Sequence, residues 1–428
     1  MNESAPMTDA YRRYALGLLL VVYVSNFIDR QILTILAESI RRDLDLSDTQ
    51  LGFLGGLAFA VFYTFAGIPI ARWADRGTRR TIIALGLFVW SGMTALTGLA
   101  RSFTELALAR IGVGLGEAAC SPPAHSLLSD TFPPERRGTA FSVYALGIPI
   151  GSAIGTFTGG WIVEFFDWRT AFYVVGLPGL ALAVVVRFTL REPERGAMDP
   201  QPRAPAPQES LGEVLRYMGR LLSFRHLSLA AALHAFYGYG TALFLPVFLI
   251  RVHGFGEGEL STWLALISLF AGGLGTFLGG WLGDRLAPRD QRWYVGVPGI
   301  ATALAIPFAV GVYLWPDRYG ALLFAVPAAI LGPMYLGPTF AMAQGLARPS
   351  MRALVSAILL FVINLIGLGL GPQAVGALSD GLAPTHGVES IRYSLLYVVV
   401  GGAVWSTLHY VLAARTLRED LAVARASA

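Results

Sequence analysis

The chain has 428 residues, of which 54% are hydrophobic and only 14% charged, with a mean hydropathy of +0.57. Soluble domains carry roughly 25% charged residues, so this composition excludes an ordinary soluble protein and indicates an integral membrane protein. The net charge of +4 comes from arginines spread over the loops between apolar runs, a pattern that does not favour nucleic-acid binding. All 32 basic residues are arginine, so the lysine of a Walker A loop is absent and ATP-driven transport is not expected.

Twelve apolar runs of about 20 residues, the length that crosses a bilayer, follow one another along the chain. The first run is too long and too charged for a cleavable signal peptide. The fold class predicted is therefore an all-α integral membrane protein. The predicted spans are 14–36, 50–71, 81–100, 103–125, 139–163, 169–190, 228–250, 260–283, 294–315, 319–345, 350–378 and 391–413.

The loops between these spans differ in arginine content. An even number of spans puts both termini on one side, and the loops on that side hold most of the arginines, so both termini are predicted to be cytoplasmic. The expected location is a bacterial inner membrane. The other side keeps only Arg41, Arg42, Arg101, Arg169, Arg251, Arg318 and Arg392.

One long polar interval, 191–227, divides the chain into an N-terminal six-helix bundle at 1–190 and a C-terminal bundle at 228–428. Its first part is rich in proline, which favours an extended linker. Leucines and other apolar residues then recur at helical spacing from Leu211 to Leu222, which predicts an amphipathic helix on the inner leaflet. A solvated linker helix without lipid contact is the alternative.

The first span contains the stretch SNFIDRQIL, with Asp29 and Arg30 inside an apolar run, and the fourth contains Arg110 and Glu117. Each such charge costs about 2.5–3.5 kcal/mol at a bilayer centre, so these residues are expected to face a cavity or a partner. A rise of about 1.5 Å per residue puts Asp29, Arg30 and Arg110 at one level, with Glu117 about 10 Å deeper. Three glycines between Arg110 and Glu117 leave that face open to water or to close helix contact.

Glycines at 147, 151, 155 and 159 recur every four residues in the fifth span, with Pro149 nearby. Small residues at this spacing allow helices to approach closely, and proline allows a bend. We interpret this stretch mainly as a packing surface.

The stretches ARWADRGTRR (71–80) and GWLGDRLAPRDQR (280–292) occupy matching positions in the two halves, which indicates duplication. They resemble the gate motif of the major facilitator superfamily, although Ala71 and Trp73 depart from it, and the resemblance covers essentially the whole chain. It implies two pseudo-repeated six-helix bundles and a gate on the cytoplasmic side. A basic flank that only fixes topology is the alternative. The gate residues implied are Asp75, Arg76, Arg79, Arg136, Arg137, Asp284 and Arg285.

The stretches NFIDR (26–30) and RIGVGLGEA (110–118) resemble the Spinster branch of that superfamily, whose animal members export sphingosine-1-phosphate or move lysophospholipids. The resemblance implies that the first and fourth helices line a central cavity. We therefore expect Asp29 and Glu117 to carry proton coupling, and Arg30 and Arg110 to pair with these carboxylates or with a substrate anion. A static salt-bridge cluster is the alternative.

The predicted spans of the second half contain no comparable acid, so this half is expected to offer an apolar, aromatic wall. His234 is its best titrating group near neutral pH, although a packed histidine is an equal alternative. The cavity candidates are His234, Tyr237, Tyr239, Gln344 and Asn364.

These features predict a proton-coupled secondary active transporter of an amphipathic lipid or hydrophobic anion, in which two bundles rock around a central site. A proton-coupled transporter of a small organic acid or drug is one alternative, and an uncoupled lipid facilitator or sensor is another. No HExxH, Gly-x-Ser-x-Gly or metal-spaced Cys/His pattern is present, so no enzyme, metal site or cofactor is expected. The expected partners are protons, the substrate and the lipid bilayer, and the expected state is a monomer.

Overall fold

Every regular element in the described residues, 7–198 and 209–426 of the computed structural model, is a helix. Ten segments within these ranges are long and apolar enough to cross a membrane. The last segment, Leu354–Arg425, covers two spans that pack on each other. The short helices α5 (Phe103–Glu117) and α6 (Ser121–Thr131) together form one further span. The prediction of an all-α bundle with twelve spans is confirmed.

The N-terminal half contains six spans, three of which are built from two helices joined end to end. The breaks coincide with Gly56, with the pair Pro122 and Pro123, and with the junction before Gly147. The helices are α1 (Asp9–Leu44), α2 (Asp48–Gly55), α3 (Leu57–Arg76), α4 (Arg79–Thr97), α5 (Phe103–Glu117), α6 (Ser121–Thr131), α7 (Pro134–Ala145), α8 (Gly147–Phe165) and α9 (Trp168–Thr189).

The C-terminal half repeats this arrangement after the short helix α10, and two of its spans contain π-helical segments, η1 and η4, which often mark functional sites. The helices are α10 (Leu211–Arg220), α11 (Leu222–Arg251), α12 (Glu257–Leu266), η1 (Ile267–Gly272), α13 (Gly273–Leu286), α14 (Trp293–Leu314), α15 (Arg318–Leu331), η2 (Gly332–Tyr335), α16 (Leu336–Gly345), η3 (Pro349–Met351), α17 (Arg352–Val362), η4 (Ile363–Leu370), α18 (Gly371–His386), η5 (Gly387–Glu389) and α19 (Ser390–Ala426).

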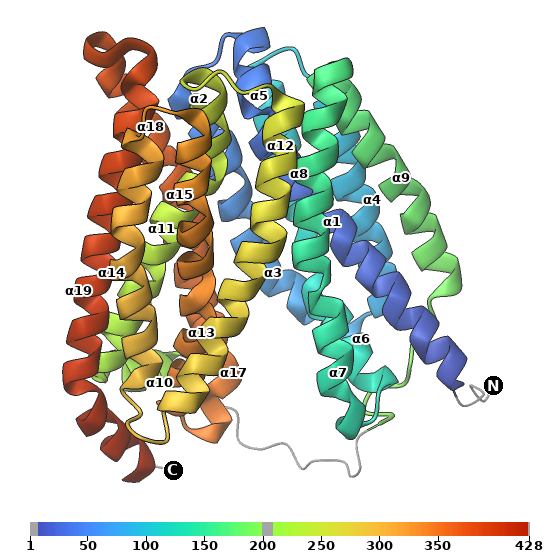
Figure 1. The fold of residues 1–428 in the computed structure, drawn as a ribbon. Helices are drawn as coiled ribbons and strands as arrows, with labels where there is room; N and C mark the ends of the chain where they lie inside the picture. The colour runs from blue at the N-terminus through green and yellow to red at the C-terminus, as the bar shows by residue number, and fades with distance from the viewer. Residues whose placement is uncertain (1–6, 199–208, 427–428) are drawn as a thin grey trace.

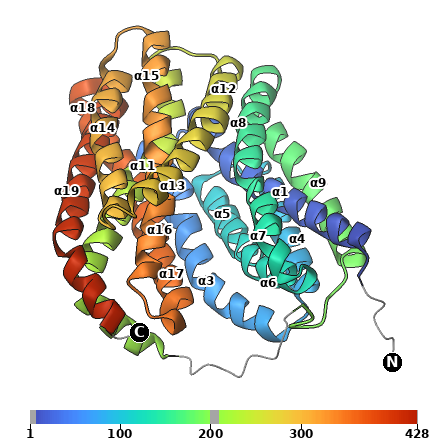
Figure 2. The ribbon, with the colours of Figure 1, turned by 60° about the horizontal axis from the view of Figure 1, so that its bottom comes forward.

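The two halves stand side by side, with the start of α1 and the end of α19 at the same end of the bundle (Figure 1). We call this the termini end and the opposite one the far end. The halves join through α8 against α12, α2 against α18, α1 against α11 and α3 against η4. Figure 2, which brings the termini end forward, shows the two halves on opposite sides. The principal joints involve the helix segments that reach the far end.

Glycines set how closely the helices of the N-terminal half approach. A Cβ atom at Gly116 would lie 2.6 Å from the backbone nitrogen of Trp90, and one at Gly114 would lie 2.9 Å from the carbonyl oxygen of Phe59. The face between Arg110 and Glu117 is therefore used for helix contact. The predicted packing role of the α8 glycines is also confirmed, because a Cβ at Gly151 would lie 2.5 Å from the carbonyl oxygen of Val24 on α1.

The segment between the halves is attached to both of them. Glu192 and Arg195 bond to the N-terminal half, and the buried Val214 and Met218 of α10 pack on the C-terminal half. The predicted amphipathic helix is thus present, but part of its apolar face covers protein. Leu211 and Leu215 remain exposed. The proline-rich stretch predicted to be extended lies mostly in 199–208, outside the described residues.

Candidate functional site

A buried ion pair joins the first and fourth spans at the residues that the sequence singled out. Arg30 of α1 donates from Nε to Oε2 of Glu117, the last residue of α5, over 2.7 Å. The Glu117 side chain is completely buried, whereas that of Arg30 is 23% exposed. Because α5 ends at Glu117 and α6 begins at Ser121 with prolines in its first turn, the carboxylate lies at a helix break.

Aromatic rings surround the Arg30 guanidinium. Its carbon lies 5.1 Å from the ring centre of Phe27, 5.0 Å from that of Phe59 and 4.8 Å from that of Tyr63. Such cation–π contacts are worth about 0.5–2 kcal/mol and hold a guanidinium in place. The aromatic partners were not predicted, because single aromatic residues in α1 and α3 look like ordinary apolar positions of a span.

Arg110 does not bond to Glu117 in this structure. Its Nε donates to the carbonyl oxygen of Leu54 over 3.3 Å, and its guanidinium lies 5.3 Å from the ring centre of Phe59. The same Phe59 ring therefore contacts both arginines. The four charged residues do gather in one region, but the structure pairs only Arg30 with Glu117.

Asp29 is 2% exposed and has no ion-pair partner among the described residues. Its Oδ1 atom is buried without a hydrogen-bond partner there, and so is Oε1 of Glu117. Burying a carboxylate oxygen without a donor is costly. A bound proton or an entering water molecule would supply the missing hydrogen bond, so this geometry suits carboxylates that change protonation.

His234 of α11 is buried in the C-terminal half and bonded on its Nδ1 side. Its Nδ1 lies 3.1 Å from the Thr302 hydroxyl and 2.8 Å from the Tyr237 hydroxyl, and its ring stacks on Tyr335 at 4.0 Å between centres. With 4% of its surface exposed, it is already satisfied by protein groups. This geometry favours the packed-histidine alternative for His234, and Tyr237 is one of its buried partners.

The remaining cavity candidates are more open. Tyr239 is half-buried and packs against apolar clusters of both halves. Gln344 is exposed and donates to the Ser356 hydroxyl over 3.1 Å, and Asn364 is half-buried within η4. Of the five candidates, Tyr239 is the one that the structure places between the halves.

The residues predicted to form a cytoplasmic gate lie at the termini end, where they contact groups of their own half. Asp284 accepts from the Tyr294 hydroxyl over 2.9 Å, and Arg285 lies over the Trp281 ring. Asp75 and Arg76 are exposed. The two other predicted gate arginines bond within the N-terminal half: Arg136 lies 4.0 Å from Asp9, and Arg137 donates to the Phe132 carbonyl.

Arg79 differs from the other predicted gate residues because it is fully buried. It forms ion pairs with Asp130 of α6 and with Glu192 of the linker, and it donates to the Pro193 carbonyl. Asp130 in turn accepts from the backbone of Gly196. Arg79 therefore fastens the start of the linker to the N-terminal half.

A second buried charge cluster, which the sequence did not reveal, joins the halves at the far end. Arg251 of α11 donates to both oxygens of Asp48, each over 2.7 Å, and to Oε2 of Glu38 over 2.8 Å. Arg41 and Arg42 also pair with Glu38. We call Glu38, Asp48 and Arg251 the far-end cluster.

Hydrogen bonds extend this joint on both sides. Asp380 of α18 accepts from the backbone nitrogens of Asp48 and Thr49 over 3.0 and 2.8 Å, so it caps α2 from the opposite half. Ser39 donates to Glu257, and Trp161 donates to Thr262 over 2.9 Å. Together these contacts close the bundle at its far end.

The chain was compared with known proteins. The model of the Major Facilitator Superfamily matches residues 19–372. An "MFS-type efflux pump" of Mycolicibacterium smegmatis is 34% identical over 95% of this chain and 94% of its own length. The "Sphingosine-1-phosphate transporter SPNS2" of Danio rerio is 25% identical over 91% of this chain and 82% of its own.

A solved structure is similar over nearly the whole chain. It is the crystal structure of a bacterial homologue of the human lysosomal transporter Spinster, in an inward-facing and unoccupied conformation. Its sequence is 34% identical, it covers 97% of this chain and 99% of its own, and the TM-score is 0.89.

Proposed function

The chain belongs to the major facilitator superfamily, is similar to its Spinster branch, and is a multi-pass membrane transporter. On this basis we propose that it couples proton movement to transport of an amphipathic lipid or hydrophobic anion. The proposed location is the bacterial inner membrane, with both termini in the cytoplasm and a monomer as the working unit. The far end then faces outward. With the far end closed, the proposed topology makes this an inward-facing state.

The observation that carries the proposal is the pairing of Arg30 with Glu117 beside an unpaired, buried Asp29. Arginine stays protonated, so it holds a negative charge near it in every state. When Glu117 binds a proton, its attraction for Arg30 falls, and the guanidinium becomes free to bind a substrate anion. When the substrate leaves, Glu117 recovers its partner and releases the proton.

This exchange provides coupling, because the Glu117 carboxylate and the substrate anion compete for the same guanidinium, so protonation of Glu117 favours substrate binding. Asp29 adds a second buried carboxylate on the same helix, next to Arg30 in sequence. We propose that Asp29 and Glu117 bind the protons and that Arg30, with Arg110 nearby, binds the anionic head group. The exposed part of Arg30 is the part available to such a ligand.

Aromatic residues around Arg30 support an amphipathic substrate. Phe27, Phe59 and Tyr63 line the guanidinium, and Tyr239 offers a further aromatic surface from the opposite half. A ligand with a phosphate or carboxylate and an apolar tail complements this combination. The name of the zebrafish relative agrees with such a ligand.

Transport of a drug or a small organic acid is the second candidate, and it is favoured by the similarity to a mycobacterial efflux pump. In that case Arg30 and Arg110 bind the substrate without requiring a long apolar tail. An uncoupled lipid facilitator is the third candidate, and it predicts flux that does not depend on a pH gradient.

Proteoliposomes loaded with a pH-sensitive dye test these candidates. Sphingosine-1-phosphate and lysophospholipid are added in one series, and short-chain organic acids and drugs that carry a carboxylate in another. A proton signal with the lipids alone supports the main proposal. A signal with small acids or drugs alone favours the second candidate, and lipid flux without any proton signal favours the third.

A further inference from the structure

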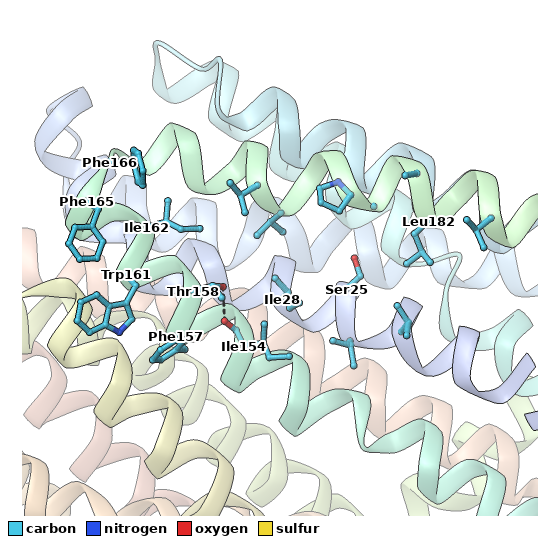
Figure 3. Close-up of a pocket in the computed structure, with 18 residues that line it drawn as sticks. Ser25, Ile28, Ile154, Phe157, Thr158, Trp161, Ile162, Phe165, Phe166 and Leu182 are labelled. Atoms are coloured by element: carbon cyan, nitrogen blue, oxygen red, sulfur yellow. Dashed lines mark hydrogen bonds between the residues drawn. The ribbon is translucent and has the colours of Figure 1, made fainter. Parts of the chain in front are cut away.

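An apolar groove of about 790 Å³ runs along the membrane-facing side of the N-terminal half, between α1, α8 and α9 (Figure 3). Phe157 and Trp161 of α8 form one wall, Leu182 of α9 forms another, and Ser25 and Ile28 of α1 lie at its base. Asn26 and Asp29 are buried within the bundle, whereas Ser25 and Ile28 line the groove. The groove therefore lies behind the proposed transport site, on the outer face of α1.

The walls of the groove offer an occupant very few hydrogen bonds. The Thr158 hydroxyl donates to the Ile154 carbonyl over 2.7 Å, and the Trp161 indole donates to Thr262 of α12. Most other side chains along the groove are aliphatic or phenyl groups, including the strongly exposed Phe165 and Phe166. An anion or a sugar would lose its hydration there without replacement, so the matching occupant is a hydrocarbon.

The groove is at least as long as one leaflet of a bilayer is thick. Its α8 wall extends from Ile154 to Phe166, which is about 18 Å at the helical rise. The hydrocarbon core of a bilayer is about 30 Å thick, so one leaflet provides about 15 Å. Because α8 reaches the far end at Phe165, the groove opens in the leaflet on that side, and its α9 wall continues to Val185, about 25 Å along the helix from Trp168.

We propose that this groove binds one acyl chain of a phospholipid from the far-end leaflet, as a resident lipid and not as a transported substrate. The occupied groove adjoins the joint between the halves. Trp161 contacts both the groove and Thr262, and a Cβ atom at the neighbouring Gly160 would lie 2.3 Å from Cβ of Ser261. A bound chain therefore supports the α8–α12 contact from the lipid side. This inference does not depend on the identity of the transported substrate.

Tryptophan quenching by brominated lipid tests the proposal. The full chain is reconstituted in phosphatidylglycerol vesicles containing increasing fractions of the same lipid with mid-chain bromine. The fluorescence of Trp161 is obtained by subtracting the spectrum of the Trp161→Phe variant from that of the unmodified protein. The fluorescence of Trp315, which is exposed at the same end, is obtained in the same way with Trp315→Phe. The two tryptophans are compared by the bromolipid fraction that gives half-maximal quenching. The depth of a tryptophan in the bilayer changes the amplitude of quenching and not this fraction.

A bound chain shifts the half-maximal fraction for Trp161 about threefold below that for Trp315. Ala181→Phe, which fills the groove from an exposed position of α9, removes the shift, whereas Val184→Phe, exposed outside the groove, retains it. Equal fractions for Trp161 and Trp315 in the unmodified groove would mean ordinary boundary lipid and overturn the proposal. A shift that survives Ala181→Phe would place the bound chain elsewhere and overturn it as well.

Discussion

Arg251 and Asp48, which are 203 residues apart in the sequence, form a two-point ion pair across the joint between the halves, with both N–O distances at 2.7 Å. Their side chains are 11% and 5% exposed. A two-point arginine–carboxylate pair fixes orientation as well as distance. Any state in which the far end opens must break this pair, so we expect the far-end cluster to act as a lock of the state in which the far end is closed.

The first prediction concerns this lock. Arg251→Gln leaves Glu38 and Asp48 buried without their shared partner, and loss of one member of a buried ion pair costs about 3–5 kcal/mol. The closed far end is destabilised, and the population shifts toward the far-end-open state by about 100-fold or more. Pulsed electron paramagnetic resonance between labels at Arg101→Cys and Val388→Cys, both exposed at the far end, measures the separation.

Arg418→Gln provides the matched control for Arg251→Gln. Arg418 pairs with Asp290 at the termini end, where its side chain is 67% exposed, and such surface pairs contribute about 0–1 kcal/mol. The label distances should therefore stay unchanged in this variant. If Arg251→Gln lowered the melting temperature without lengthening the far-end distances, the cluster would be structural and the lock would be disproved.

The second prediction concerns Glu117. Glu117→Gln preserves the shape of the side chain but cannot bind and release a proton, so proton-coupled flux should fall at least about tenfold. Substrate binding should persist, because Arg30 keeps its charge and its aromatic contacts. Dye-loaded proteoliposomes measure the flux, and Glu419→Gln, exposed on α19, serves as the control. Normal coupling in Glu117→Gln would favour the static cluster.

The third prediction concerns Asp29, which is buried without an ion-pair partner. Asp29→Asn removes a buried titrating group, so the pH dependence of transport should flatten. Folding should be retained, since the neutral amide avoids the cost of a buried charge. Transport rates measured across a series of external pH values, at constant membrane potential, give the profile. A profile identical to that of the unmodified protein would remove Asp29 from the coupling mechanism.

The fourth prediction concerns how the folding stability depends on pH through Asp167, at the start of α9. Asp167 caps this helix by accepting from the Thr170 backbone over 2.7 Å, and hydrogen bonds from the Thr170 side chain and backbone lower the pKa of Asp167. A lowered pKa in the folded state means stabilisation that is present above about pH 3.9, the unfolded value, and is lost as pH falls through the folded value. Asp167→Ala should cost about 0.5–2 kcal/mol at neutral pH.

Asp167→Asn separates the cap from the charge, because asparagine also caps helices. Thermal unfolding in detergent at neutral pH should show a loss for Asp167→Ala and little change for Asp167→Asn. Between pH 4 and the acid limit, the difference between unmodified protein and Asp167→Ala should shrink. A difference that grows on acidification would contradict the assigned direction.

The spans and the central charges could be predicted because each depends on local sequence. An apolar run of about 20 residues is sufficient to place a span, and a charge inside such a run stands out without any knowledge of its neighbours. The residues Asp29, Arg30, Arg110 and Glu117 were found in this way, and the structure brings all four into one region. Which arginine pairs with Glu117 was not predictable, since the choice depends on how α3 and its Phe59 ring separate Arg30 from Arg110.

The far-end cluster shows the limit of sequence reasoning most clearly. Arg251 lies at the end of a span, where arginine looks like a topology signal, and Glu38 and Asp48 look like ordinary loop-side acids. Only the docking of the two halves brings these three residues together and removes them from water.

The sequence by itself determined the membrane class, the twelve spans and the family resemblance, because hydrophobic length and short motifs are properties of contiguous residues. Tertiary structure alone decided which charges pair, which end of the bundle is closed and where the apolar groove lies. Those properties arise from contacts between segments up to 332 residues apart, such as Asp48 with Asp380. Their energies depend on burial, which a linear sequence does not specify.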